Sequence, residues 1–220
     1  MQLVIGNKNY SSWSLRPWLL MQHFGLAFQE QQIWLYSAQM NNDMQRFSPS
    51  RKVPVLIDQD ITIWDSLAIC EHLNEQHLAG KAWPADQAKR AIARSICAEM
   101  HSGFNAIRNE MPMNCRRAVA PITLSASATQ DIARICEIFE QCLEHNDTSA
   151  DTNEESGFLF AQFSIADAFY MPIVARFHSY AIAVPDKVNR YMQTMLQLPA
   201  YQLWLSQAQA EEAVIAVAEV

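Results

Sequence analysis

Several features that define whole classes of protein are missing from this 220-residue chain. It has no basic excess, because its formal net charge is -7 and its pI is near 5.3. General nucleic-acid binders and proteins held on anionic membranes depend on a basic field, so we expect neither partner. Residues 144–157 hold five acidic side chains and no Lys or Arg, which leaves about -2 on the rest. We expect this segment to be a solvated loop.

The cysteine patterns of disulfide frameworks and zinc sites are also missing. The five cysteines are an odd number and include no CxxC pair. They lie in apolar, helical surroundings, so we expect reduced core thiols and no bound metal. These are Cys70, Cys97, Cys115, Cys136 and Cys142.

Long apolar runs are lacking as well. No segment approaches the roughly 18 apolar residues of a membrane span. The amino-terminal residues do not combine a basic start, an apolar stretch and a small-residue cleavage site. We therefore expect a soluble, cytoplasmic protein without a membrane partner.

The chain does contain enough apolar residues, 50%, for one large core or two modest ones. Its first 80 residues alternate between strand and helix signals in the order β-α-β-α-β-β-α. The patterns predict strands at 3–5, 31–36, 53–57 and 61–64, and helices at 14–24, 38–47 and from 65 onward.

After His77 the strand signals stop and helical periodicity dominates. Helices are expected at 87–111, 127–145, 164–177 and 187–195. Ser164 and Asp167 have the spacing of a capping box, which predicts a structural role for both. The sequence thus predicts a small α/β domain at residues 1–79 and an all-helical domain at 88–220.

Four local motifs resemble the glutathione transferase superfamily, especially zeta-like bacterial members related to maleylacetoacetate isomerase. They are Ser11-Ser12-Trp13-Ser14-Leu15-Arg16, Lys52-Val53-Pro54-Val55-Leu56, Asp65-Ser66-Leu67-Ala68-Ile69 and Ser164-Ile165-Ala166-Asp167. Each motif is weak alone, but their order and spacing together are specific. The resemblance covers nearly the whole chain and implies a thioredoxin-like amino-terminal domain, a helical second domain and glutathione as co-substrate.

The serine-rich turn suits an anion, because hydroxyls and free amides meet at the positive end of a helix. A glutathione thiolate is such an anion. The resemblance matches Ser11 to the family's activating serine, and Ser12 and Tyr10 are the alternatives. Read without the resemblance, these serines cap the helix. Many zeta enzymes have a cysteine where this chain has Trp13, and no cysteine precedes Cys70 here. This argues against a mixed-disulfide reductase.

The other two amino-terminal motifs provide candidates for holding the peptide part of glutathione. Pro54 belongs at a strand start or a bulge, and in the family the Val53-Pro54 bond is cis, so that Val53 pairs with the cysteinyl backbone. Lys52, or alternatively Arg51, is a candidate for the glycyl carboxylate. Asp65 and Ser66 are candidates for the γ-glutamyl end, at a helix N-terminus that Asp65 also caps.

The second substrate is expected between the domains, near Trp13. His101, Asn105 and Arg108 have spacings of four and three, which predicts one helical face, and Arg176 lies in the capped helix. Any of these, or Arg116 and Arg117, could receive a substrate carboxylate, although exposed arginines are commonly surface charge.

The expected function is a glutathione transferase that adds the thiolate to a small electrophile. The alternatives are a glutathione-dependent cis-trans isomerase of the maleylacetoacetate type and a non-catalytic module that binds glutathione or protein. We also expect a homodimer.

Overall fold

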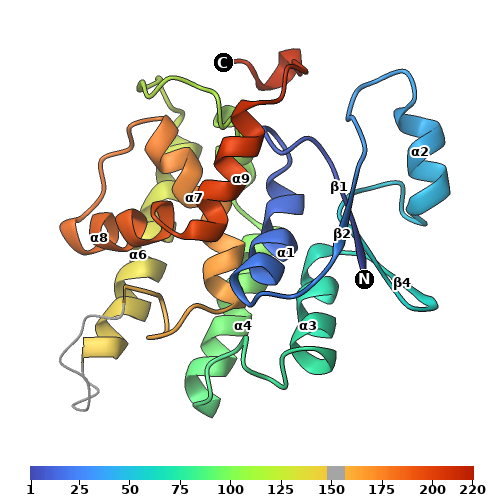
Figure 1. The fold of residues 1–220 in the computed structure, drawn as a ribbon. Coiled ribbons are helices and arrows are strands. Elements are labelled where there is room, and N and C mark those ends of the chain that lie inside the picture. Colours follow the sequence, from blue (N-terminus) through green and yellow to red (C-terminus); the bar gives the residue numbers. More distant parts are fainter. Residues whose placement is uncertain (148–156) are drawn as a thin grey trace.

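The computed structural model describes residues 1–147 and 157–220 of the chain. A four-stranded sheet lies at one side of the molecule (Figure 1). Its strands are β1 (Gln2–Ile5), β2 (Gln29–Gln32), β3 (Val55–Asp58) and β4 (Ile61–Ile63), in the order β2-β1-β3-β4. β2 is parallel to β1, whereas β3 is antiparallel to both β1 and β4. The predicted β-α-β-α-β-β-α order and thioredoxin-like arrangement are confirmed.

β2 lies earlier in the chain than the predicted strand at 31–36. It is an edge strand with the polar sequence QEQQ, and its side chains are exposed or only partly buried. Polar residues on an edge strand disfavour pairing with another chain. After β2, Ile33 donates to the Ile5 carbonyl and Leu35 to the Asn7 side chain. Tyr36 then has a positive φ of 62°, which ends the extended run. The β-branched and aromatic residues that suggested a strand belong to this turn.

Three helices connect and cover the strands. They are α1 (Ser12–His23), α2 (Met40–Phe47) and α3 (Ser66–Gln76). α1 is capped by Ser11 and followed by Gly25 at a φ of 66°, a conformation that glycine adopts without strain. α3 is capped by Asp65, whose carboxylate accepts from the Leu67 amide at 2.8 Å.

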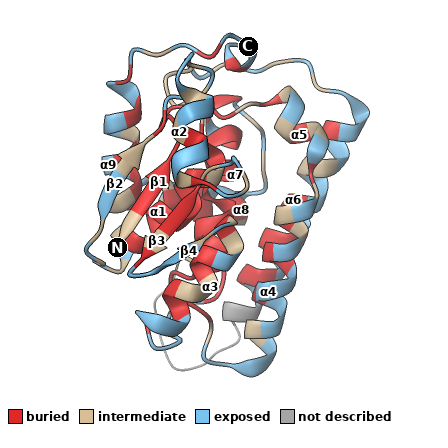
Figure 2. Ribbon diagram, turned by 90° about the vertical axis from the view of Figure 1, so that its right-hand side faces the viewer, coloured by how far each residue is buried: buried red, intermediate tan, exposed pale blue. Residues whose placement is uncertain are grey.

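The helices of the second half are α4 (Gln87–Ser102), α5 (Asn105–Glu110), α6 (Ala126–Asp147), α7 (Ile165–Ser179), α8 (Asp186–Leu196) and α9 (Pro199–Gln209). α7 is buried along almost its whole length, and the outer faces of α4 and α6 are exposed (Figure 2). The capping box predicted for α7 is present, with the Asp167 carboxylate accepting from the Ser164 amide at 2.9 Å. α9 was missed, although Pro199 occupies its first turn.

Two other predictions need correction. The helix predicted at 87–111 is broken, because Gly103 is extended and Phe104 has a left-handed φ of 59°. The acidic segment begins as helix, since α6 continues to Asp147, and residues 148–156 lie outside the described part. Within the described residues, no helix is long and apolar enough to cross a membrane.

One cluster of buried side chains joins both halves of the molecule. α1 packs on α3 and also on α7 and α9, and Trp18 meets Trp204 edge to face at 5.0 Å. The boundary near residues 79–88 therefore stays a prediction. All five cysteines are unpaired, and only Cys115 is not fully buried. Burial raises the pKa of all five thiols, that of Cys115 to about 12, which disfavours the reactive thiolate and fits the predicted packing role.

Candidate active site

The N-terminus of α1 brings two serine hydroxyls together under nearly complete burial. The Ser11 hydroxyl donates to the Ser14 hydroxyl at 2.7 Å, and its oxygen accepts from the Ser14 amide. Ser14 in turn accepts from the Gly6 amide at 3.1 Å. Ser11 is therefore the N-cap of α1, as the capping interpretation expects.

The Ser11–Ser14 hydrogen bond is reversible in principle, because Ser14 has a hydroxyl proton of its own. In the described structure that proton reaches no other acceptor. If Ser14 donates to Ser11, the Ser11 proton becomes available to an anion without loss of the contact. Ser12 differs, since its oxygen accepts from the Arg176 guanidinium at 3.4 Å. Tyr10 is directed elsewhere, toward Glu219 and Arg116.

Three guanidinium groups surround this turn. Arg16 lies 4.1 Å from the ring centre of Trp13, and Arg108 approaches the same ring at 4.8 Å. Arg176 is held by the Met111 and Pro172 carbonyls and reaches Ser12. None of the three forms an ion pair with a carboxylate among the residues that the structure describes.

Of the three guanidinium groups, that of Arg16 has the least favourable electrostatic environment. It is 1% exposed, and its Nε and Nη1 atoms have no hydrogen-bond partner in the described structure. Burial, followed by repulsion from Arg108 and Arg176, lowers the pKa of Arg16 to about 9. Burial and Arg108 likewise lower the pKa of Arg176 to about 10. Such a cluster favours an anionic ligand, which would offset the repulsion.

The second pole of the site is the N-terminus of α3. Ser66 is 1% exposed, and its hydroxyl oxygen has no partner among the described residues. Asp65 is more exposed, and its second carboxylate oxygen contacts His101 Nε2 at 2.6 Å. His101 also packs edge to face on Trp13 at 5.3 Å. A chain of contacts therefore joins the two helix N-termini.

The Lys52–Pro54 segment leads into β3. The Val53–Pro54 peptide bond is cis, as the family resemblance implies. Val53 is half-buried and Pro54 is buried. The backbone of Lys52 is fixed on both sides by the Ser48 hydroxyl, and its side chain extends into solvent, as does that of Arg51.

The predicted helical face formed by His101, Asn105 and Arg108 is wrong. The break at Gly103 and Phe104 places His101 on α4 and Arg108 on α5. His101 and Arg108 still meet at Trp13, whereas Asn105 is exposed at the start of α5.

Arg116 and Arg117 do not join this cluster. Arg116 donates to the carbonyls of Glu211 and Ala213, and Arg117 donates to those of Ser179 and Val220. Both arginines therefore bind backbone carbonyls of residues 211–220 and do not face the candidate site.

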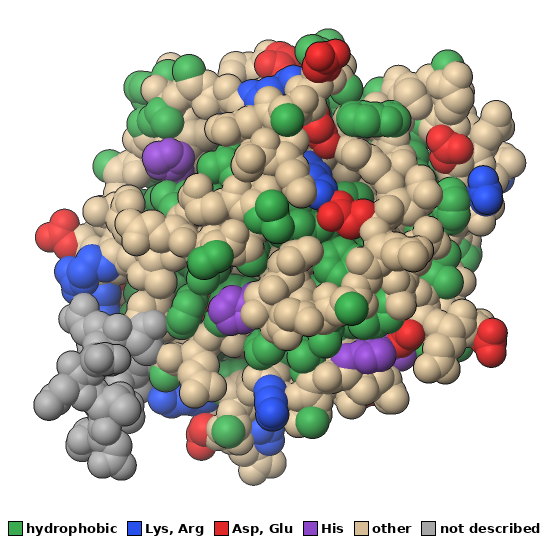
Figure 3. All heavy atoms as spheres, in the orientation of Figure 1, with side chains coloured by type: hydrophobic (Ala, Val, Ile, Leu, Met, Phe, Trp, Pro, Cys, Tyr) green, Lys and Arg blue, Asp and Glu red, His purple; other side chains and the backbone are tan. Residues whose placement is uncertain are grey.

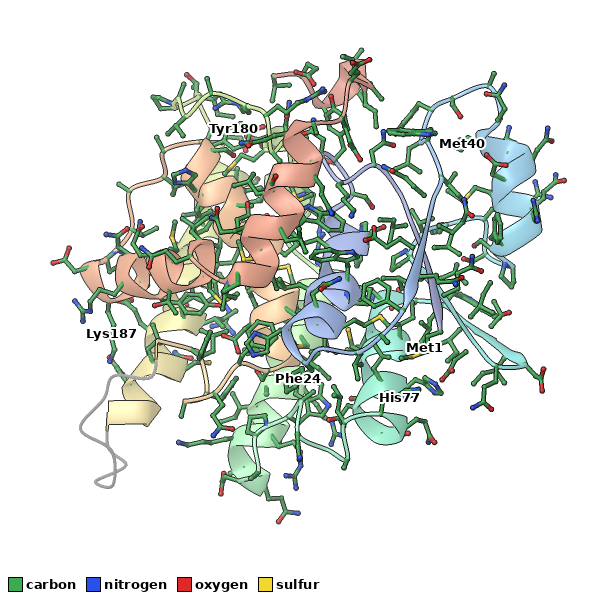
Figure 4. All side chains as sticks on the ribbon, viewed as in Figure 1. Met1, Phe24, Met40, His77, Tyr180 and Lys187 are labelled. Atoms are coloured by element: carbon green, nitrogen blue, oxygen red, sulfur yellow. The ribbon has the colours of Figure 1, made fainter. Side chains whose placement is uncertain are left out.

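A cavity of about 730 Å³ opens at the other end of α1, where Figure 4 labels Phe24. Its described wall mixes aromatic side chains with small, polar and charged ones and includes none of the predicted site residues. The hydroxyls, guanidiniums and free helix amides that can bind and stabilise an anion are instead gathered at the N-termini of α1 and α3.

Comparisons with known proteins support the same region. Residues 10–76 match the family model described as "Glutathione S-transferase, N-terminal domain". A maleylacetoacetate isomerase of Rattus norvegicus is 38% identical over 71 residues, which are 32% of this chain and 33% of that protein. A probable maleylacetoacetate isomerase of Caenorhabditis elegans is 31% identical over 98 residues, 44% of this chain and 45% of that protein. The matched regions thus span less than half of these relatives.

The whole fold has solved counterparts. A glutathione transferase homologue from Burkholderia, solved with bound glutathione, superposes with a TM-score of 0.71 at 22% identity. That alignment covers 96% of this chain and 98% of the other.

Proposed function

We propose that this chain, whose residues 10–76 match the amino-terminal domain of glutathione S-transferases, is an enzyme of that superfamily that adds the glutathione thiolate to a small electrophile. Residues 1–79 bind glutathione, and residues 88–220 complete the site for the second substrate. The observation that carries this proposal is the buried Ser66 hydroxyl, which has no partner among residues 1–147 and 157–220, beside Asp65 at the N-terminus of α3. A buried hydroxyl without a partner is costly unless a ligand satisfies it.

In this proposal glutathione lies between the two helix N-termini. Ser66 and the first amides of α3 receive the γ-glutamyl carboxylate, and the Asp65 carboxylate receives the ammonium group. The backbone of Val53, beside Pro54, pairs with the cysteinyl residue as an added strand does. The exposed Lys52 side chain meets the glycyl carboxylate. The thiol then reaches the turn at Ser11 and Ser12.

The turn contains enough stabilisation to ionise the thiol. Lowering a thiol pKa from about 8.5 to about 6.5 requires roughly 2.7 kcal/mol in favour of the anion. A hydrogen bond to a charged acceptor contributes about 1.5–3 kcal/mol and a helix N-terminus about 0.3–1 kcal/mol. A hydroxyl from Ser11, with Ser12 as the alternative, therefore suffices together with α1, and the thiol proton leaves to solvent without a dedicated base.

A second candidate function is cis-trans isomerisation of an unsaturated carboxylic acid. The observation that favours it is the group of three guanidiniums at the Ser12–Trp13 turn, which has no acidic ion-pair partner in the described structure. Carboxylates of the substrate would supply the missing negative charge. Thiolate addition to the double bond, rotation and elimination would then return glutathione.

The proposal is tested by isothermal titration with glutathione, followed by turnover with a model electrophile. Ser66→Ala and Asp65→Ala should weaken glutathione binding, with a smaller effect on the rate of the bound complex, because both residues act far from the sulfur. Ser95→Ala is the matched control, since the Ser95 hydroxyl lies on the exposed face of α4 and donates to the Ala91 carbonyl of its own helix.

Unchanged affinity in both α3 variants would contradict the proposed placement of glutathione. Tight glutathione binding without turnover of any electrophile would instead favour the non-catalytic binding module.

A further inference from the structure

A second group of chemically capable side chains lies away from the glutathione site. Asp58 is the last residue of β3, His72 lies on α3, and His77 is the C-cap residue of α3. Figure 3 shows histidine side chains beside a carboxylate on this face of the molecule, in the region where Figure 4 labels His77. The fold therefore brings a strand end and a helix C-terminus together around three ligand-type groups.

The three groups converge on one point. His72 Nε2 lies 2.9 Å from Asp58 Oδ2, and His77 Nε2 lies 2.7 Å from the same oxygen. Their ligand atoms all lie within 4.8 Å of one another. Asp58 is 8% exposed, so this carboxylate is almost removed from water. No Lys or Arg pairs with it among the described residues.

Two imidazole nitrogens and one carboxylate oxygen are a donor set suited to Zn²⁺. Metal–nitrogen and metal–oxygen bonds of about 2.0–2.2 Å place tetrahedral ligand atoms roughly 3.3 Å apart. The two nitrogens would each have to move about 0.5 Å away from the carboxylate oxygen, and their own separation, which is at most 4.8 Å, would have to become about 3.3 Å as well. Both rings are partly exposed, with side-chain exposures of 17% for His72 and 26% for His77, so such a shift meets little packing resistance.

We propose that Asp58, His72 and His77 form a three-ligand binding site for Zn²⁺, with water as the fourth ligand. The bound ion ties the end of β3 to the end of α3. Ser66 lies at the opposite end of α3, about 9 Å along the helix axis from His72 and about 16 Å from His77. Zinc and glutathione therefore bind at separate places, and the zinc proposal stands apart from the proposed function.

The site is tested on the full chain, free of affinity tags and freed of metal by a chelator that is then removed. Titration with ZnCl₂ should show one ion per chain and a rise in melting temperature. Titration with CoCl₂ should give a visible absorption band without intense thiolate charge transfer, because the ligands are nitrogen and oxygen.

His77→Gln separates metal ligation from hydrogen bonding, since a glutamine amide can still donate to Asp58. This variant should keep its fold by circular dichroism and bind zinc far more weakly, by more than the 10- to 100-fold typical of losing an outer-shell partner. His178→Ala, at an exposed position of α7, is the control and should bind normally. Absence of zinc binding to the native chain at 100-fold molar excess would overturn the proposal, as would unchanged affinity in His77→Gln.

Discussion

The sharpest prediction concerns which hydroxyl stabilises the glutathione thiolate. We expect Ser11→Ala to raise the pKa of the bound thiol and to slow turnover near neutral pH. Loss of a charge-assisted hydrogen bond of about 1.5–3 kcal/mol corresponds to a rise of about one to two pKa units. Glutathione affinity should fall much less, because both ends of the peptide remain held at α3 and β3.

The structure adds a second readout, because the two serines have different structural roles. Ser11 caps α1 and bonds Ser14, so Ser11→Ala should also lower the free energy of unfolding by about 1 kcal/mol. Ser12 only accepts a 3.4 Å contact from Arg176, so Ser12→Ala should destabilise the protein less. It should also shift the thiol pKa less.

The assay is the ultraviolet absorbance of the thiolate against pH, measured on the glutathione complex of each variant, with urea unfolding in parallel. If the pKa of the bound thiol is unchanged in Ser11→Ala but raised in Ser12→Ala, Ser12 is the residue that stabilises the thiolate. No shift in either variant would refute the serine mechanism and leave the α1 amides as the stabilising groups. If Ser11→Ala lowers the free energy of unfolding but leaves the thiol pKa unchanged, Ser11 serves only as the N-cap of α1.

Three further predictions address the electrostatics and the assembly. Arg16→Met should raise the free energy of unfolding of the ligand-free protein by about 1–4 kcal/mol in urea, because it removes a buried charge that has no ion-pair partner among the described residues; destabilisation would contradict this. Burial raises the pKa of Asp167 to about 6, so the folded state binds this proton more tightly than the unfolded state. The stability of the native protein relative to Asp167→Asn should therefore increase by about 3 kcal/mol as pH falls from 7 to below 4, and a flat difference would refute the assignment. We also propose a two-fold homodimer, supported by exposed apolar side chains in the α/β half such as Tyr36 and Trp64; a concentration-independent mass near 25 kDa in sedimentation would contradict it.

Local signals in the sequence were enough for most of the fold. Caps at Ser11, Asp65 and Ser164 start three helices, and apolar periodicity marks their buried faces. The wrong predictions of secondary structure occur where contacts distant in sequence determine the local backbone conformation. β2 is a polar edge strand without an apolar pattern, and the helix break at Gly103 was overlooked because the left-handed backbone falls on the next residue, Phe104, a residue type that rarely adopts it. Both cases lie beyond what periodicity can detect.

The candidate site was predictable only where it is local. The Ser11–Ser12 turn and the Asp65–Ser66 cap are each contiguous, so their residue types alone suggested anion binding. His101 reached the vicinity of Trp13 for a reason other than the one predicted, since it shares no helix with Arg108. The groups missed as sites were Arg16, which entered the sequence analysis only as the end of the serine motif, and Asp58 with its two histidines, which are distant in sequence.

The position of Arg16 links the fold to the chemistry. Its lowered pKa means that burying the cation costs the folded state several kcal/mol, a penalty that no carboxylate of the described structure offsets through an ion pair. α1 tolerates this cost because the same helix buries Leu15, Trp18 and Leu19 completely, each contributing about 1.5–3 kcal/mol. The apolar face of α1 thus holds its cationic N-terminal turn rigidly in place before any anion arrives. In the proposed function, such preorganisation would favour a bound thiolate or substrate carboxylate, because little rearrangement is needed when the negative charge forms.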